Sequence, residues 1–303
     1  MDAVSNTDDP SSRQPSTEGA TKPHLEIRPL TGAIGAEIEG VAIVDGISDA
    51  LANEIRSALD RHRVIFFRDQ HLDDDAQLAL ARIFGEPEVH PIRRAMGSNE
   101  TLSDIVDTPD STPDRDGWHT DVTYMKTPPG EAIVRCEVAP ETGGDTMWVD
   151  MVAIWESLSE PMQRFLEPLD GFHSTDAGFM DYIKRHFPED VAEKVKAVVG
   201  DGARHPIVRV HPRTGEKSLF IDRSYMARIE GLSDGESQAI QQYLLNLVDQ
   251  PNLQCRFRWQ KGDVAIWDER TTQHFGAADH RGSARTLRRC TVEGEPPLKS
   301  GAA

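Results

Sequence analysis

Two residue types that commonly bind metals stand close together in the segment GWHTDVTY, where a single threonine separates His119 from Asp121. In an extended chain, residues i and i+2 project from the same face about 7 Å apart, so an imidazole and a carboxylate can converge on one ion. A third candidate, His274, follows the predicted strand DVAIW. Two imidazoles and one carboxylate form the facial triad that leaves positions open on Fe(II). These three residues therefore predict an iron site.

A strand near the C-terminus carries arginines that are suited to bind a carboxylate. Alternation along RTLRRCTVE places Arg285 and Arg289 on one face and Arg288 on the other. A buried carboxylate is costly unless it is paired, and the planar, permanently charged guanidinium is its usual partner. We expect Arg285 and Arg289 to point into the protein and Arg288 to point outward.

The segments around these residues resemble the taurine dioxygenase/TfdA family of Fe(II)- and 2-oxoglutarate-dependent dioxygenases. They are GWHTDVTYMKTPP, ETGGDTMW, DVAIWDERTTQHFGAADH and the arginine-bearing strand, in the family's order and near its spacing. The resemblance implies that His119, Asp121 and His274 ligate iron. It also implies that Arg285 and Thr146 bind the distal carboxylate of 2-oxoglutarate, with Arg289 as the further candidate for that role.

The implied reaction uses O2 and 2-oxoglutarate to hydroxylate a substrate and forms succinate and CO2. Because Asp121 is present where halogenating relatives carry a small residue, we expect hydroxylation. Two other interpretations of the ligand set stay open. A metal-dependent hydrolase, for example with zinc, would have no use for Arg285 and Thr146. A non-enzymatic jelly-roll binding protein would hold a structural metal with a closed coordination sphere.

The resemblance also suggests how an anionic head group is bound. In taurine-specific members, a histidine in an HP step 29 residues before the first iron ligand holds the sulfonate, and this position is His90 here. Arg289 is expected to complete the anion site. Val122, which follows a predicted ligand, is a further candidate substrate residue.

Two arginines replace residues that line the pocket of taurine-specific members. Arg93 and Arg115 stand at the positions of a tyrosine and an asparagine. If both face the pocket, they repel the ammonium of taurine, or their stems pack on a longer apolar tail near Tyr225. We expect a small anionic substrate without an amine, hydroxylated beside the heteroatom so that the product breaks down to an aldehyde or ketone. The candidates are an alkyl sulfonate, an alkyl sulfate ester and an aryloxy or alkyl carboxylate, with taurine itself as the alternative.

Two positions depart from the family pattern. Glu269 stands in WDER where the family has WDNR, and His280 replaces an aromatic residue. We expect neither side chain to touch the three ligands.

Composition limits the partners of the protein. The 303 residues carry 33 basic and 51 acidic side chains, a net charge of −18, which disfavours binding to nucleic acid. No stretch approaches the roughly 20 apolar residues of a membrane span, and the first residues do not form a signal peptide. The three cysteines predict reduced, buried thiols. We therefore expect a cytoplasmic protein, with a homo-oligomer (dimer or tetramer) implied by the family.

Hydrophobic periodicity predicts many short strands, with helices at the start and in inserts. The expected fold is mainly β, a double-stranded β-helix (jelly roll, cupin-like) core decorated by helices. Residues 1–24 are expected to be a disordered tail and 25–303 a single dioxygenase domain. Residues 86–130 contain no long periodic run and predict a functional loop region. Helices are expected at 49–62, at 73–85, within 151–204 and at 233–249. Strands are expected at 24–30, 33–44, 64–67, 131–139, 146–151, 207–210, 218–221, 254–259, 263–267 and 285–293.

Overall fold

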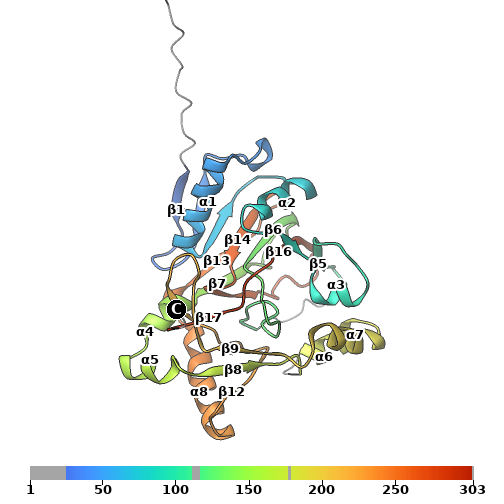
Figure 1. Cartoon of the computed structure of the whole chain (residues 1–303). Helices are drawn as coiled ribbons and strands as arrows, with labels where there is room; N and C mark the ends of the chain where they lie inside the picture. Colours follow the sequence, from blue (N-terminus) through green and yellow to red (C-terminus); the bar gives the residue numbers. More distant parts are fainter. Residues whose placement is uncertain (1–24, 111–116, 177–178, 302–303) are drawn as a thin grey trace, which may run out of the picture.

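The computed structural model describes residues 25–110, 117–176 and 179–301 (Figure 1). The tail expected at 1–24 lies outside these ranges. The strands are β1 Glu26–Pro29, β2 Ala36–Glu39, β3 Val64–Phe67, β4 Pro87–Glu88, β5 Ser103–Asp107, β6 Glu131–Val138, β7 Thr146–Asp150, β8 Asp170–His173, β9 Ala203–Pro206, β10 Val208–Val210, β11 Lys217–Leu219, β12 Met226–Ile229, β13 Gln254–Phe257, β14 Val264–Asp268, β15 Thr272–Gly276, β16 Arg285–Val292 and β17 Leu298–Lys299. The helices are α1 Asp49–His62, α2 Asp74–Arg82, α3 Pro91–Ala95, α4 Met151–Ser157, α5 Glu160–Leu166, α6 Phe179–His186, α7 Glu189–Val199 and α8 Asp234–Asn246, with short 3-10 turns η1 Ile43–Asp45, η2 Leu247–Asp249 and η3 Pro251–Leu253.

Two sheets enclose the part of the core that supports the site. The larger has eight strands in the order β1-β2-β3-β14-β6-β16-β4, with β5 also pairing with β16, and the smaller has the order β13-β7-β15. Aromatic rings from both sheets meet between them. Phe66 of β3 stacks on Phe257 of β13 with ring centroids 4.1 Å apart, and Trp148 of β7 meets Trp267 of β14 edge-on. The fold is therefore sheet-rich, with helices added outside.

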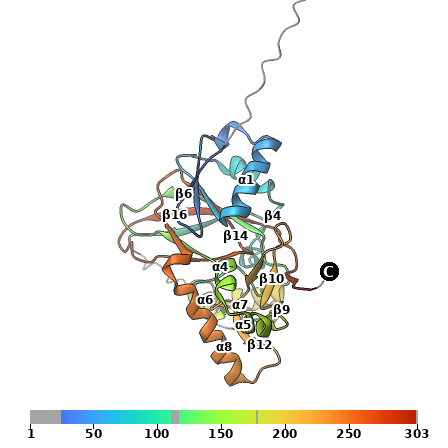
Figure 2. The same cartoon turned by 90° about the vertical axis from the view of Figure 1, so that its left-hand side faces the viewer.

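The larger sheet is covered on both faces. In β3, Val64 and Phe66 join the core between the sheets, while Ile65 and Phe67 join a second core beneath α1 and α2. This explains the unbroken apolar run VIFF, because alternate side chains project to opposite faces and each face is buried. In both views α1 lies at one end of the molecule and α8 at the other (Figures 1 and 2).

The helices α3, α6 and α7 lie together on one side of the sheets (Figure 1). Their apolar faces share a cluster that includes Ile92 of α3, Phe179 of α6 and Val195 of α7. Residues of α3 and α6 form one wall of the cavity described below, and α7 packs against both helices.

Several predicted elements are confirmed, including the helix at 49–62 and the strand at 64–67. The three cysteines are free and buried, as expected. None of the helices in the described part of the chain is long and apolar enough to cross a membrane. The expected loop region 86–130 was partly wrong, because it also contains β4, α3 and β5. The strand β15 was missed, since its first residues are buried on both faces and show no alternation.

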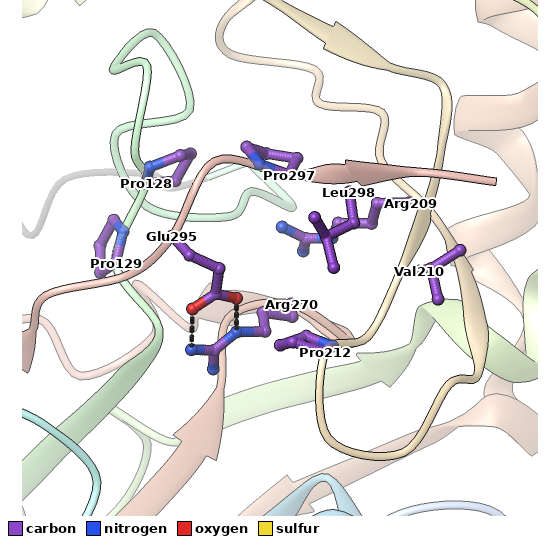
Figure 3. Close-up of a pocket in the computed structure, with 9 residues that line it drawn as sticks. All are labelled: Pro128, Pro129, Arg209, Val210, Pro212, Arg270, Glu295, Pro297 and Leu298. Atoms are coloured by element: carbon purple, nitrogen blue, oxygen red, sulfur yellow. Dashed lines mark hydrogen bonds and ion pairs between the residues drawn. The ribbon is translucent and has the colours of Figure 1, made fainter. Parts of the chain in front are cut away.

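The C-terminal segment is held against the body by a two-pronged ion pair (Figure 3). Arg270 Nε and Nη2 donate to the two carboxylate oxygens of Glu295 at 2.6 and 2.9 Å. The remaining Arg270 Nη1 donates to the buried Glu131 at 2.9 Å. Beyond Glu295, β17 pairs with β10, which anchors the C-terminal segment to the three-stranded sheet β11-β10-β17.

Replacing Glu295 by Ala should destabilise the protein by about 2 kcal/mol, because a largely buried guanidinium loses its two-pronged partner while Glu131 remains. Urea unfolding measures the loss. The matched control is Glu160→Ala, which breaks the exposed pair between Glu160 and Arg164 and should barely move the midpoint. Equal losses in the two variants would contradict the structural role of the Glu295 pair.

Candidate active site

The two histidines of the predicted metal set are direct neighbours across a strand pair. His119 N–H donates to the carbonyl of His274 at 3.1 Å, and His274 N–H donates back to the carbonyl of His119 at 2.8 Å. Asp121 follows two residues after His119. Its Oδ1 lies 3.7 Å from His119 Nε2 and 4.0 Å from His274 Nε2. The structure thus brings together three residues that the sequence separates by up to 155 positions.

These donors fit a divalent metal ion. One ligand atom from each of His119, Asp121 and His274 lies within 4.8 Å of the other two. Ligands that share an ion at about 2.1 Å stand roughly 3 to 4 Å apart, so only small movements are needed. His119 Nδ1–H donates to the carbonyl of Gly117 at 2.8 Å, which leaves the lone pair on Nε2.

The electrostatics favour the forms of these residues that bind metal. Burial alone would raise the pKa of Asp121, but Arg289 and the two histidines outweigh it and hold that pKa well below its usual range. Burial, reinforced by His119, lowers the pKa of His274 well below its ordinary value. An ionised carboxylate and a neutral imidazole are the states that coordinate a metal.

Asp121 has two further neighbours. Arg289 Nη1 lies 2.8 Å from Asp121 Oδ2, the oxygen that faces away from the histidines. Glu269 Oε2 accepts the backbone N–H of Asp121 at 3.1 Å, and Glu269 Oε1 accepts Trp267 Nε1–H at 2.7 Å. The expectation that Glu269 does not touch the ligands was therefore wrong. Burial and the Asp121 charge raise the pKa of Glu269 well above its ordinary value.

The face alternation predicted for the last strand is confirmed. Arg285 and Arg289 line the same cavity, and Arg288 points away to Asp74 and Asp104, 2.7 Å from each. Arg285 Nη2 lies 3.5 Å from Thr146 Oγ1, so the predicted pair is brought together. Trp259 Nε1–H donates to the same Oγ1 at 2.9 Å. With its oxygen accepting these bonds, the Thr146 hydroxyl keeps its hydrogen free to donate.

A cavity of about 1000 Å³ connects these groups. His90, Arg93 and Tyr225 line it as the sequence predicted, and Arg93 is also paired with Glu100. Val122 is not among its lining residues and packs instead in the apolar cluster behind it. Arg115 lies outside the described residues.

His90 is the N-cap residue of α3, and its Nδ1 accepts the backbone N–H of Ile92 at 3.3 Å. Burial, with Arg289 and Arg93 nearby, lowers the pKa of His90 to about 4. The ring is therefore neutral near pH 7, and its proton sits on Nε2 because Nδ1 is an acceptor. His90 can offer one N–H donor to an anion in the cavity.

Sequence reasoning missed several lining residues. These residues come from α3, β5, the α6 region and the segment after β13, and only the fold brings them into the same cavity as the triad. They are Ile92, Met96, Asp107, Phe179, Tyr182, Phe187 and Trp259. Asp107 stands opposite Arg285 in the pairing of β5 with β16, but the sequence does not reveal this register.

A second group of possible metal ligands consists of Asp60, His211 and Asp268. Here a cation is already supplied by the chain, because Arg213 Nη2 lies 2.7 Å from Asp60 and 3.6 Å from Asp268. His211 Nε2–H donates to Asp268 at 2.7 Å. This group is an ion-pair network of the fold.

A two-histidine, one-carboxylate cluster at the base of a cavity, on a sheet-rich fold, is typical of the non-haem iron oxygenases. The model of the family "Taurine catabolism dioxygenase TauD, TfdA family" matches residues 26–291, so the chain belongs to this family.

Known proteins similar to this chain agree with the family. An alpha-ketoglutarate-dependent sulfate ester dioxygenase of Pseudomonas putida is 36% identical over 285 residues, which cover 92% of this chain and 94% of that protein. An alkylsulfatase of Acinetobacter baylyi is 36% identical over 274 residues, with 89% and 86% covered. The solved structure of a taurine dioxygenase from Burkholderia xenovorans is 32% identical, with a TM-score of 0.77 and coverage of 92% and 94%.

The protein is therefore a 2-oxoglutarate-dependent dioxygenase that uses Fe(II), 2-oxoglutarate and O2. This resolves the class of reaction that the sequence left open between a dioxygenase, a hydrolase and a binding protein. When bound, iron with 2-oxoglutarate supplies the oxidising chemistry, and the chain supplies ligands, charge and a shielded cavity.

Replacing His119 by Ala should remove one of three ligands and lower the Fe(II) bound per chain to a small fraction of wild type, with turnover lost. Metal content after dialysis measures this directly, and thermal unfolding checks that the fold persists. The control is His71→Phe, a histidine outside the cavity lining that pairs with Asp69. A His119→Ala protein with full iron content and normal succinate release would disprove the ligand assignment.

Proposed function

We propose that the protein hydroxylates an alkyl sulfate ester at the carbon next to the ester oxygen. Iron is held by His119, Asp121 and His274, and the distal carboxylate of 2-oxoglutarate binds Arg285 and Thr146. The observation that carries the proposal is that one cavity is lined by all of these residues, by the possible anion donors His90 and Arg289, and by an apolar arm of Ile92, Met96, Phe179 and Phe187. We further propose that the two facing sheets form a double-stranded β-helix, with the site at its open end.

The anion-binding corner is made by His90 and Arg289. The Nε2–H of neutral His90 and the guanidinium N–H groups of Arg289 not directed at Asp121 are donors suited to sulfate oxygens. Arg289 already neutralises Asp121, so the sulfate adds one negative charge next to the positive charge of the metal. The donors hold the head group beside the ligands, which brings the adjacent CH2 close to the metal.

The same cavity disfavours taurine. Three carboxylates line its described part, those of Asp104, Asp107 and Asp121, and each has an arginine partner in Arg288, Arg285 or Arg289. A substrate ammonium would thus find no unpaired carboxylate among the described lining residues. Arg185 adds further positive charge to the lining, whereas the charge of Arg93 is balanced by Glu100. An anion without an amine suits this charge pattern better.

An apolar arm supports an alkyl tail. Ile92, Met96, Phe179 and Phe187 line the part of the cavity formed by α3 and the α6 region. Each CH2 group that leaves water for such a surface contributes about 0.8 kcal/mol at full burial. Relatives named as acting on sulfate esters and alkyl sulfates support the same choice of substrate.

The two oxygen atoms of O2 go to different products in the proposed reaction. One oxygen atom of O2 enters the C–H bond beside the ester oxygen, and the other enters succinate as CO2 leaves 2-oxoglutarate. The hydroxylated carbon then expels sulfate: the bond from carbon to the ester oxygen breaks, the hydroxyl loses its proton, and an aldehyde forms. Residues of the chain only position the reactants and exclude water in these steps.

Incubation with Fe(II), ascorbate, 2-oxoglutarate and a linear alkyl sulfate should give succinate, inorganic sulfate and aldehyde in equal amounts. Taurine in a parallel reaction should release sulfite at least about tenfold more slowly, because its ammonium is not paired. Chromatography of all products measures both reactions. Sulfite release from taurine at the rate of the best sulfate ester would contradict the proposal.

Replacing Met96 by Ser should raise KM for dodecyl sulfate about fivefold, from loss of roughly 1 kcal/mol of apolar contact. KM for a butyl ester should not change, because its tail does not extend along the arm. Met96 is 53% exposed, so folding is unaffected, and the equally exposed Val44, outside the cavity lining, provides the control Val44→Ser. Equal effects on both esters would show that Met96 does not contact the tail.

A further inference from the structure

We propose that His280 and Asp107 are positioning residues for 2-oxoglutarate, acting through Arg285. The inference rests on the proposed binding of the distal carboxylate by Arg285. It assigns a role to the histidine that replaces an aromatic residue in the segment GAADH, and to an acid on the neighbouring strand β5.

The three side chains form a chain of contacts along one wall of the cavity. His280 Nε2 lies 3.0 Å from Asp107 Oδ2, and the same oxygen lies 3.4 Å from Arg285 Nη1. Asp107 stands directly opposite Arg285 in the pairing of β5 with β16, a favourable position for unlike charges. The His280 side chain is only 1% exposed and that of Arg285 only 9%. An ionised Asp107 can only accept, so His280 Nε2 is the donor.

Arg285 is left with one edge unused. Its Nε is buried and has no hydrogen-bond partner within the described part of the chain, and Nη2 has only the long contact to Thr146 at 3.5 Å. A carboxylate pairs with a guanidinium through two parallel N–H groups, and Nε with Nη2 is such a pair. Asp107 on Nη1 therefore holds the far edge and leaves the near edge for the co-substrate.

His280 fixes this arrangement from behind. Gly144 has no side chain, and a Cβ there would lie 3.0 Å from Arg285 Cδ and 3.1 Å from His280 Nδ1, so both residues pack on its backbone. Without the His280 N–H, the Asp107 carboxylate would lose one of the two donors that it has within the described ranges, and it would turn toward solvent or across the guanidinium. Either movement would displace the Arg285 guanidinium and the Nε–Nη2 edge proposed to bind the co-substrate.

The test is calorimetric titration of 2-oxoglutarate into full-length protein loaded with Mn(II), without any sulfate ester. We expect His280→Phe, which keeps a ring but loses the donor, to raise Kd about five- to tenfold, less than the loss of a direct hydrogen bond to a charged group, because His280 acts on the co-substrate only through Arg285. His280→Gln can place an N–H near the position of Nε2 and should restore Kd to within about twofold of wild type. His71→Phe, which breaks an exposed histidine–aspartate pair, should leave Kd unchanged.

A double-variant cycle shows whether His280 acts through Asp107. In an Asp107→Ala background, whatever its own Kd, adding His280→Phe should cause no further change. An undiminished effect there, or an unchanged Kd in His280→Phe alone, would overturn the inference. Arg285→Ala in the same titration distinguishes the two proposals. An unchanged Kd for 2-oxoglutarate in Arg285→Ala would refute the assignment of Arg285 itself. A raised Kd in Arg285→Ala, together with a wild-type Kd in His280→Phe, would refute only the role of His280.

Discussion

A carboxylate buried beside an arginine is the interaction on which the site depends. Asp121 has to be ionised to bind a metal, and its burial alone would favour the neutral acid. Arg289 on β16 stabilises that charge, and the two histidines lie near the other oxygen. This pair also matters for substrate binding. One edge of the Arg289 guanidinium is paired with Asp121, and its remaining N–H groups can bind an anion in the cavity.

The same arrangement recurs at the other arginine of β16. Arg285 is matched on one edge by Asp107 and open on the other, as Arg289 is matched by Asp121. Strand alternation puts both arginines on one face, and separate acidic partners prevent two like charges from being buried uncompensated. One strand therefore supplies the two proposed anion sites, and their surroundings differ: Thr146 and Trp259 lie near Arg285, whereas His90 and the proposed metal ligands lie near Arg289.

The sequence allowed prediction of the parts of the site that are local or lie on one strand. The spacing of His119 and Asp121 and the alternation of Arg285 and Arg289 needed only strand geometry. The pairing of β5 with β16 could not be predicted, since register depends on long-range packing, so Asp107 was missed. The strand β15 was hidden by burial on both faces. Glu269 was misjudged because its contact with Asp121 spans 148 residues.

The backbone bridge between His119 and His274 has a consequence for how the protein handles its metal. In small zinc domains the unfolded chain gains order only when the ion binds, and removal of the ion unfolds them. Here two of the three donors are tied by a reciprocal pair of peptide hydrogen bonds, and sheet packing supports both strands. The entropy of assembling the donors is lost during folding, before any ion arrives. We therefore expect that a metal ion held by these residues can be removed and replaced while the chain stays folded.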